Sequence, residues 1–235
     1  MPASLKGRRV VLAGGAGGLG SATTQLLAAE GAALTVSFAH HEERARALSD
    51  IAVIQHADLT LADHRRVLLD QSPGLYGLVA FSGIPARGAV EETIEESFRV
   101  NAMGPLLLAR EAAARMQSGG AAGAIVLIAT MQAVALFPNS TAYAAAKAAL
   151  AHGARILAKE MRGANIRVNV VAPGVMQAGM AAASIASGKY NRYLEEAAIP
   201  RFGEAGDIAR AVRFLLEPDN YVTGQVLSVD GGITL

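Results

Sequence analysis

The stretch 10-VVLAGGAGGLGSA-22 runs from four apolar residues into five glycines and then into small residues typical of a helix start. Ordered glycine costs backbone entropy, so this density of glycines requires a physical reason. A glycine loop between a buried strand and a helix brings backbone N–H groups and a helix N-terminus up to a phosphate. The stretch therefore predicts the first unit of a dinucleotide-binding fold, and a tight turn without a ligand is the alternative.

The glycines fit two spacings. Gly15, Gly17 and Gly20 match G-x-G-x-x-G, the general dinucleotide pattern, whereas Gly14, Gly18 and Gly20 match the variant G-x-x-x-G-x-G. The stretch itself does not decide between the two.

Short apolar runs alternate with longer helical patterns along the whole chain. Strands are expected at Val10–Ala13, Leu34–Phe38, Val53–His56, Leu78–Phe81, Ile125–Ala129, Arg167–Val171 and Val226–Val229. Helices are expected at Gly18–Glu30, Glu42–Ser49, Thr60–Gln71, Ile94–Met116, Ala142–Met161 and Asp207–Leu216. Most of the strands are apolar throughout, as in a parallel sheet covered on both faces. We therefore expect one α/β domain over residues 1–235, in which 176–203 forms a substrate-covering loop.

Composition narrows the possible functions. The chain has 235 residues, 52% of them hydrophobic and 17% charged, a net charge of +1 and no cysteine. These values argue against nucleic-acid binding, disulfides and cysteine metal sites, and the low charge favours oligomer interfaces. The five histidines, which show no metal-binding spacing, are His40, His41, His56, His64 and His152. The N-terminus lacks a signal-peptide pattern and no long apolar run is present, so we expect a cytoplasmic protein without a membrane partner.

Tyr143 and Lys147 stand four residues apart in an alanine-rich helical segment, so their side chains emerge on one face. A phenol with a pKa near 10 is a poor acid at neutral pH, and a neighbouring ammonium is expected to lower that pKa. Tyr143 could then exchange a proton with an alcohol or carbonyl oxygen. Such a pair also arises by chance, so the rest of the sequence has to support it.

That support comes from the order of several motifs. Thr130 ends a buried strand thirteen residues before Tyr143, and Asn101 lies in an otherwise apolar helix. The segments "HADLT" with Asp58, "RVNVVAPG" and "TGQVLSVDGG" complete the set. Together with G-x-x-x-G-x-G and Tyr-x-x-x-Lys, this order resembles the short-chain dehydrogenase/reductase family over essentially the whole chain. The resemblance favours the spacing of Gly14, Gly18 and Gly20.

The resemblance implies a Rossmann-type, doubly wound domain with a seven-stranded parallel sheet and helices on both faces. It also implies catalytic roles for Tyr143 as general acid and base, Lys147 as ribose ligand, Thr130 in place of the usual serine, and Asn101 in a water relay. The implied cofactor-binding residues are Gly14, Gly18, Leu19, Gly20, Ser37, Phe38, Ala39, His40, Asp58, Leu59, Ser82, Gly83, Tyr143, Lys147, Pro173, Gly174 and Val175. For Asp58, contact with adenine and helix capping remain alternatives. A homodimer or homotetramer through the helices of Asn101 and Tyr143 is implied as well.

The sequence departs from the family pattern in three places. Ala13 replaces a threonine, "AFSG" at 80–83 keeps only Gly83 of Asn-Asn-Ala-Gly, and Ala178 replaces a threonine or serine. These changes weaken cofactor contacts and leave the proton-transfer pair intact.

The end of the second predicted strand bears on the choice of cofactor. A carboxylate there accepts the ribose hydroxyls of NAD, and this chain has Phe38 at that position. His40, His41 and Arg44 follow, and they could face a phosphate, although the glycine loop itself has no lysine or arginine. The pattern favours NADP(H) and carbonyl reduction, with NAD as the alternative.

The pocket walls proposed from the sequence are Met131, Gln132, Phe137, Met176 and Met180, although ordinary core packing would also explain the apolar ones. A flexible apolar wall suits a small, largely apolar ketone or secondary alcohol. The pattern resembles the 3-oxoacyl-carrier-protein reductase branch of the family, but "GGAAGAIVLI" lacks a basic residue that would attract an acidic carrier. The alternative functions are those of an NAD-dependent alcohol or dihydrodiol dehydrogenase and of a non-catalytic dinucleotide-binding protein.

Overall fold

The computed structural model describes residues 4–181 and 185–235 and is built on one parallel sheet. Its seven strands lie in the order β3-β2-β1-β4-β5-β6-β7. They are β1 (Arg9–Ala13), β2 (Ala33–Phe38), β3 (Val53–His56), β4 (Leu75–Ala80), β5 (Gly123–Ile128), β6 (Ile166–Pro173) and β7 (Val226–Val229). The predicted fold class is confirmed, because all strand pairs are parallel and helices cover the sheet.

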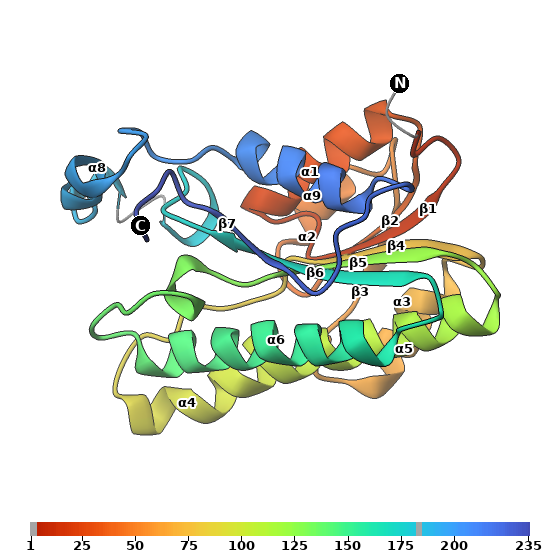
Figure 1. Cartoon of the computed structure of the whole chain (residues 1–235), viewed down its shortest axis with the longest axis horizontal. Coiled ribbons are helices and arrows are strands. Elements are labelled where there is room, and N and C mark those ends of the chain that lie inside the picture. Colours follow the sequence, from red (N-terminus) through yellow and green to blue (C-terminus); the bar gives the residue numbers. More distant parts are fainter. Residues whose placement is uncertain (1–3, 182–184) are drawn as a thin grey trace.

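Helices pack on both faces of the sheet (Figure 1). One face carries α1 (Gly18–Ala29), α2 (Glu42–Arg46) and α9 (Ala205–Leu216), and the other carries α3 (Ala62–Asp70), α4 (Val90–Phe98), α5 (Gly104–Ser118) and α6 (Thr141–Glu160). The central strands β4 and β5 are buried along their whole length, so both faces of the sheet bury apolar side chains. Within the described residues, no helix is both long enough and apolar enough to cross a bilayer.

The expected single helix Ile94–Met116 is wrong, because the chain forms two α-helices there. A π-helical turn, η1 (Arg99–Met103), separates α4 from α5. Asn101 lies in this turn and hydrogen-bonds outside its own helix, to the backbone of Ile84. π-helical turns inside α-helices are often found at functional sites. The wider turn gives Asn101 a position that a regular helix would not provide.

Other predicted boundaries shift by a few residues. The helix expected from Thr60 begins at Ala62, the helix expected to reach Ser49 ends at Arg46, and the strand expected from Leu78 begins at Leu75. The segment 176–203 contains η3 (Gly179–Ala181) and α8 (Arg192–Glu196), and a parallel bridge joins its ends, Met176 and Gly203. Part of this segment, 182–184, lies outside the described residues.

The topology places the site. The chain moves outward from β1 to β3 in one direction and from β4 to β7 in the other, so the strand order reverses between β1 and β4. Ligands of open α/β sheets bind beyond the carboxyl ends of the strands at such a reversal. The glycine loop follows β1, and the segment 81–83 follows β4, so both lie at this point.

Candidate active site

The glycine loop is tightly packed around several of its glycines. Gly14 has φ +73°, a left-handed conformation that favours glycine. A Cβ atom on Gly18 would lie 2.5 Å from the backbone nitrogen of Gly179, and one on Gly20 would lie 2.6 Å from the carbonyl oxygen of Gly14. At Gly15 and Gly17 the corresponding contacts are 2.8 Å and 3.2 Å. Close contacts therefore occur in both spacings, whereas the left-handed conformation of Gly14 belongs to G-x-x-x-G-x-G alone.

Buried hydroxyl groups hold this loop from behind. The Gly14 N–H donates to Ser37 Oγ at 3.2 Å, and Thr24 Oγ1 donates to the Gly15 carbonyl at 3.1 Å. Ser37 and Thr24 are both buried, so these hydroxyls support the loop and do not face solvent. The loop ends at the N-terminus of α1, where backbone N–H groups and the helix dipole favour an anion.

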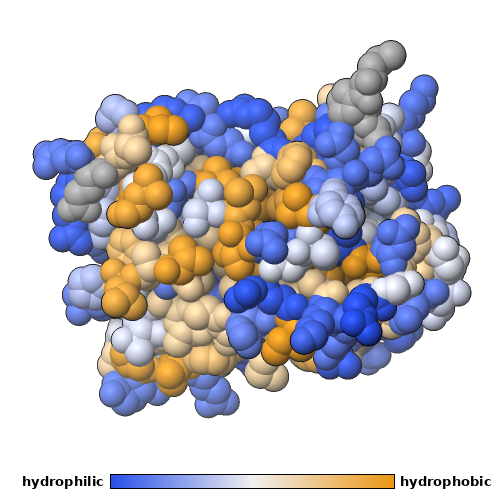
Figure 2. Space-filling view, in the orientation of Figure 1, coloured by the Kyte–Doolittle hydropathy of each residue, from blue (hydrophilic) through white to orange (hydrophobic). Residues whose placement is uncertain are grey.

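A cavity of about 530 Å³ opens beside the loop, at the carboxyl end of the sheet. Among the residues that line it are Leu19, Phe81, Ser82, Gly83, Ile128, Thr130, Met131, Gln132, Phe137, Tyr143, Lys147, Pro173, Gly174, Val175, Met176, Tyr190 and Tyr193. Hydrophobic residues gather on the face shown in Figure 2, in its left half between the region of α8 and that of α4. A mostly apolar cavity with a few converging polar groups is the usual form of a small-molecule site.

Thr130, Tyr143 and Lys147 reach this cavity from two neighbouring elements. Thr130 lies two residues after the end of β5, and Tyr143 and Lys147 lie one helical turn apart near the start of α6. The ammonium Nζ of Lys147 donates to the carbonyls of Ile128 at 2.8 Å and Ser82 at 3.1 Å. Since Lys147 is only 2% exposed, these bonds fix its position between β4 and β5.

Burial changes the proton affinities of both groups. It raises the pKa of Tyr143 to about 12 and lowers the pKa of Lys147 to about 7. The prediction that Lys147 lowers the pKa of Tyr143 is therefore wrong for this structure. Desolvation is the cause of both shifts, and the hydrogen bonds of Lys147 go to backbone carbonyls, not to the phenol. At neutral pH, Tyr143 is protonated and can donate a proton.

Asn101 stands behind the cavity wall and is fully buried. Its Oδ1 accepts from the Ile84 N–H at 2.9 Å, and its Nδ2 donates to the Ile84 carbonyl and to Ser97 Oγ, both at 3.0 Å. A Cβ atom on Gly83 would lie 2.8 Å from Asn101 Oδ1 and 3.3 Å from Lys147 Nζ. Asn101 and Lys147 therefore converge on Gly83, which accounts for the glycine in "AFSG".

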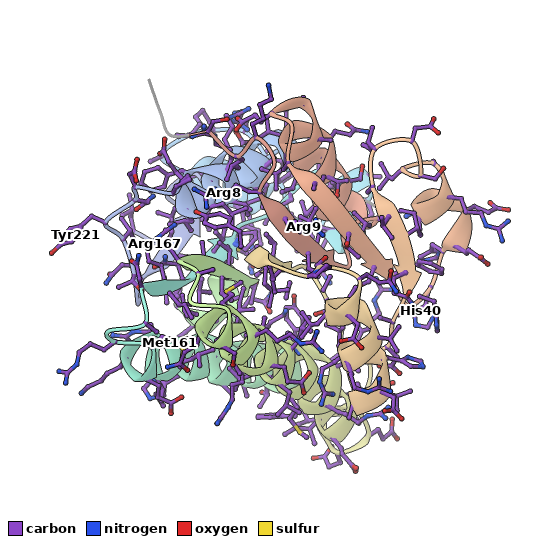
Figure 3. All side chains as sticks on the ribbon, turned by 90° about the vertical axis from the view of Figure 1, so that its right-hand side faces the viewer. Arg8, Arg9, His40, Met161, Arg167 and Tyr221 are labelled. Atoms are coloured by element: carbon purple, nitrogen blue, oxygen red, sulfur yellow. The ribbon has the colours of Figure 1, made fainter. Side chains whose placement is uncertain are left out.

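The residues expected at the outer part of a cofactor site lie at the ends of β2 and β3, away from this cavity. Phe38 is half-buried and its ring packs edge-on against His56, with centroids 5.4 Å apart. Ala39 and His40 are exposed, and the His40 side chain projects outward in Figure 3. Within the described residues, no carboxylate occupies the end of β2.

Asp58 follows β3 and closes a local turn. Its Oδ1 accepts from both the backbone N–H and the Oγ1 of Thr60, at 2.9 and 2.8 Å. These hydrogen bonds lower the pKa of Asp58. The alternative that Asp58 caps the following helix is wrong, because α3 begins at Ala62 and its N-cap residue is Leu61. Leu59 is buried in the core.

Four of the five wall residues expected from the sequence line the cavity, and the side chain of the fifth, Met180, lies outside the described part. Sequence reasoning missed Lys189, Tyr190 and Tyr193, which α8 and the residues before it bring over the cavity. The Tyr193 ring packs on Phe137, with centroids 5.9 Å apart. In the sequence, the only signal for these wall residues was the aromatic pair Tyr190 and Tyr193 inside the predicted covering loop, 176–203.

These residues fit a dinucleotide. The glycines leave a cradle that Cβ atoms would fill, and the buried hydroxyl of Ser82 has no hydrogen-bond partner among the described residues. An unpartnered buried hydroxyl at the wall of a cavity is suited to a ligand hydroxyl or phosphate. The cradle, Ser82 and Lys147 lie around the same strand ends.

Comparison with known proteins agrees with this arrangement. Residues 14–234 match the family model described as enoyl-(acyl carrier protein) reductase. Carbonyl reductase family member 4 of Danio rerio is 33% identical, over 97% of this chain and 98% of its own. A chloroplastic NADPH-dependent aldehyde reductase-like protein of Arabidopsis thaliana is 30% identical, over 98% and 96%. A short-chain type dehydrogenase/reductase from Mycobacterium ulcerans superimposes with a TM-score of 0.91, at 27% identity, over 98% of this chain and 91% of that one.

The chain belongs to the short-chain dehydrogenase/reductase family. It is an oxidoreductase that acts on CH–OH or C=O groups.

Proposed function

We propose that the protein is an NADP(H)-dependent reductase of a small, largely apolar ketone, which it interconverts with the secondary alcohol. The observation that carries this proposal is the meeting of Thr130, Tyr143 and Lys147 in one cavity beside the glycine loop. Two relatives are named as a carbonyl reductase and an NADPH-dependent aldehyde reductase-like protein. These names support carbonyl reduction with NADPH.

Tyr143 is the proton donor in reduction and the acceptor in oxidation. Because burial raises its pKa to about 12, the phenol carries its proton at neutral pH, as a donor to a carbonyl oxygen must. The Thr130 hydroxyl oxygen accepts a weak hydrogen bond from the Gln132 N–H at 3.4 Å, which leaves the hydroxyl proton for the substrate oxygen. The chemistry that a bound nicotinamide supplies is hydride transfer to or from the carbonyl carbon.

Lys147 provides a charge close to this proton transfer. Its pKa of about 7 means that its ammonium is partly populated at neutral pH, where it is held by the carbonyls of Ile128 and Ser82. Asn101 positions the segment 83–84 against which Lys147 packs. Pro173, Gly174 and Val175 line the cavity opposite, where a nicotinamide would be held.

Phe38, His40, His41 and Arg44 support NADP(H) over NAD. An aromatic ring replaces the carboxylate that would repel a 2′-phosphate. His40, His41 and Arg44 are exposed just beyond β2, where a phosphate could be reached. The cavity walls Met131, Phe137 and Met176 support a largely apolar substrate.

We further propose assembly into a homodimer or homotetramer through α5 and α6 together with the π-helical turn. Met103, Leu107 and Ile156 are large hydrophobic residues of these elements, and all three are exposed. Exposed apolar residues on neighbouring elements are typical of protein interfaces.

Replacing the phenol tests the function. Tyr143→Phe is expected to lower kcat for ketone reduction by about a thousandfold, because a general acid contributes a factor of roughly 10²–10⁴. The Kd for NADPH should change little. The measurement is the loss of nicotinamide absorbance over a panel of ketones, with NADPH and NADH in parallel.

The matched control is Tyr221→Phe, since Tyr221 is fully exposed and lies outside the cavity (Figure 3). Undiminished turnover by Tyr143→Phe would refute the assigned proton donor. NADPH binding without turnover of any ketone or alcohol by the native chain would instead favour a non-catalytic protein. Faster turnover with NADH would favour the NAD-dependent alternative.

A further inference from the structure

Gln132 lies at the inner wall of the cavity, two residues after Thr130, in the short helix η2 (Met131–Ala133). Its backbone N–H donates to Thr130 Oγ1, so the two residues are held within one turn. Its amide oxygen Oε1 is buried and has no hydrogen-bond partner among the described residues. Gln132 is thus a polar side chain at the reacting end of the cavity, and the proton transfer described above does not use its side chain.

A buried carbonyl oxygen without a donor is unfavourable, because it has lost its hydration and gained no hydrogen bond in return. Native structures contain few such groups, and a ligand that completes the hydrogen bond is one explanation. Met131 and Phe137, the neighbouring walls, carry no side-chain N–H or O–H that could serve as the donor. A hydroxyl group of a molecule bound in the cavity would supply the donor that Oε1 lacks.

Resting on the proposed function, we propose that Gln132 is a specificity-determining residue whose Oε1 accepts a hydrogen bond from a substrate hydroxyl beside the reacting carbonyl. The preferred substrate class is then the α-hydroxy ketones. Thr130 contacts the reacting oxygen, and Gln132 is tied to Thr130, so the group that Gln132 binds lies on a nearby carbon. The apolar side chains of Met131, Phe137 and Met176 also line the cavity, which matches a compact substrate with one additional hydroxyl.

Pairs of ketones that differ by one hydroxyl test this proposal. Suitable probes are acetoin against butanone and 2-hydroxycyclohexanone against cyclohexanone, with kcat/KM measured in NADPH. The wild-type enzyme is expected to prefer the hydroxylated member about tenfold, the effect of one hydrogen bond. Gln132→Met keeps the length of the side chain and removes the acceptor, so it should abolish the preference. Gln132→Glu keeps an acceptor and should retain it.

The controls separate this role from a structural one. Gln117→Met makes the same replacement at an exposed position of α5 and should leave the preference intact. An equal fall for both members of a pair in Gln132→Met would indicate a structural role and overturn the proposal. A weaker Kd for NADPH with an unchanged preference would assign the donor to the cofactor and overturn it too.

Two further outcomes distinguish this inference from the proposed function. If the wild-type enzyme reduces both members of each pair equally well, or if Gln132→Met keeps the preference, the specificity role fails and the reductase function stands. If the wild-type enzyme reduces no ketone in any pair or in the wider panel, the proposed function fails, and the specificity role fails with it. Gln132→Leu serves as a second acceptor-free variant should Gln132→Met fold poorly.

Discussion

The catalytic side of the sheet and its β2–β3 edge are built in opposite ways. On the catalytic side, Asn101 is fully buried, Lys147 is 2% exposed, and both are held by backbone groups from other elements. At the β2–β3 edge, Ala39 and His40 are exposed, and Phe38 is only half-buried.

Under the proposed function, this difference separates the residues that take part in proton transfer from those that select the cofactor. Residues that must hold a proton or a charge in one place are buried in a shared hydrogen-bond network, so replacing one disturbs its neighbours. Residues that select between cofactors act from the surface, where one side chain can change without affecting the fold. We therefore expect large stability effects on the catalytic side and small, selective effects at the edge.

The largest effect is expected from Asn101→Leu. This change removes three hydrogen bonds and leaves the Ile84 N–H and carbonyl without their partner. At about 1 kcal/mol for each bond, the free energy of unfolding should fall by about 3 kcal/mol. Urea unfolding measures this value. Ser97→Ala removes one of these three bonds and also the hydrogen bond from Ser97 to the Ala142 carbonyl, so it should cost about two-thirds as much. Equal stabilities for the native chain and Asn101→Leu would contradict the network.

A smaller effect, dependent on pH, is expected from Lys147. Its pKa is about 7 in the folded protein and 10.5 in the reference state, so between these values the unfolded chain binds more protons. The free energy of unfolding therefore rises with pH across this window. As the pH falls toward 7, this gain in stability is lost. Between pH 7 and pH 9 the rise should be about 2 kcal/mol.

Lys147→Met removes this dependence and fills a similar volume. The stability of the native chain relative to the variant should increase from pH 7 to pH 9, as measured by urea unfolding at each pH. Lys159→Met, at the last turn of α6, is the control and should follow the native chain. Parallel curves for the native chain and Lys147→Met would show that Lys147 does not titrate in this window.

The same contrast explains what could be predicted from the sequence. Tyr143 and Lys147 lie one turn apart on α6, and Thr130 lies two residues after β5, so the sequence could predict that they lie close together; all three line the cavity. The strands were predictable because both faces of the sheet are apolar. The π-helical turn at Asn101 was not, because Asn101 bonds there to Ile84, a contact that exists only once the chain has folded.

Burial was the other quantity that the sequence could not supply. The direction of the Tyr143 pKa shift depends on how much water the folded chain removes from the phenol, and spacing to Lys147 does not measure that. The covering segment was located, but the approach of Tyr193 to Phe137 depends on how α8 folds back over the cavity.

The smallest effect, and the most selective, is expected at the edge. Phe38→Asp places a carboxylate at the end of β2, where it would repel a 2′-phosphate. Under the proposed use of NADPH, kcat/KM for NADPH should fall about tenfold relative to kcat/KM for NADH, which corresponds to about 1.4 kcal/mol. Phe38→Asn is the matched control, because it loses the same ring contact with His56 and adds no charge. The two variants differ only in that charge. Equal ratios of kcat/KM for NADPH to kcat/KM for NADH in both variants would therefore place the 2′-phosphate away from β2 and contradict a role of this edge in cofactor selection.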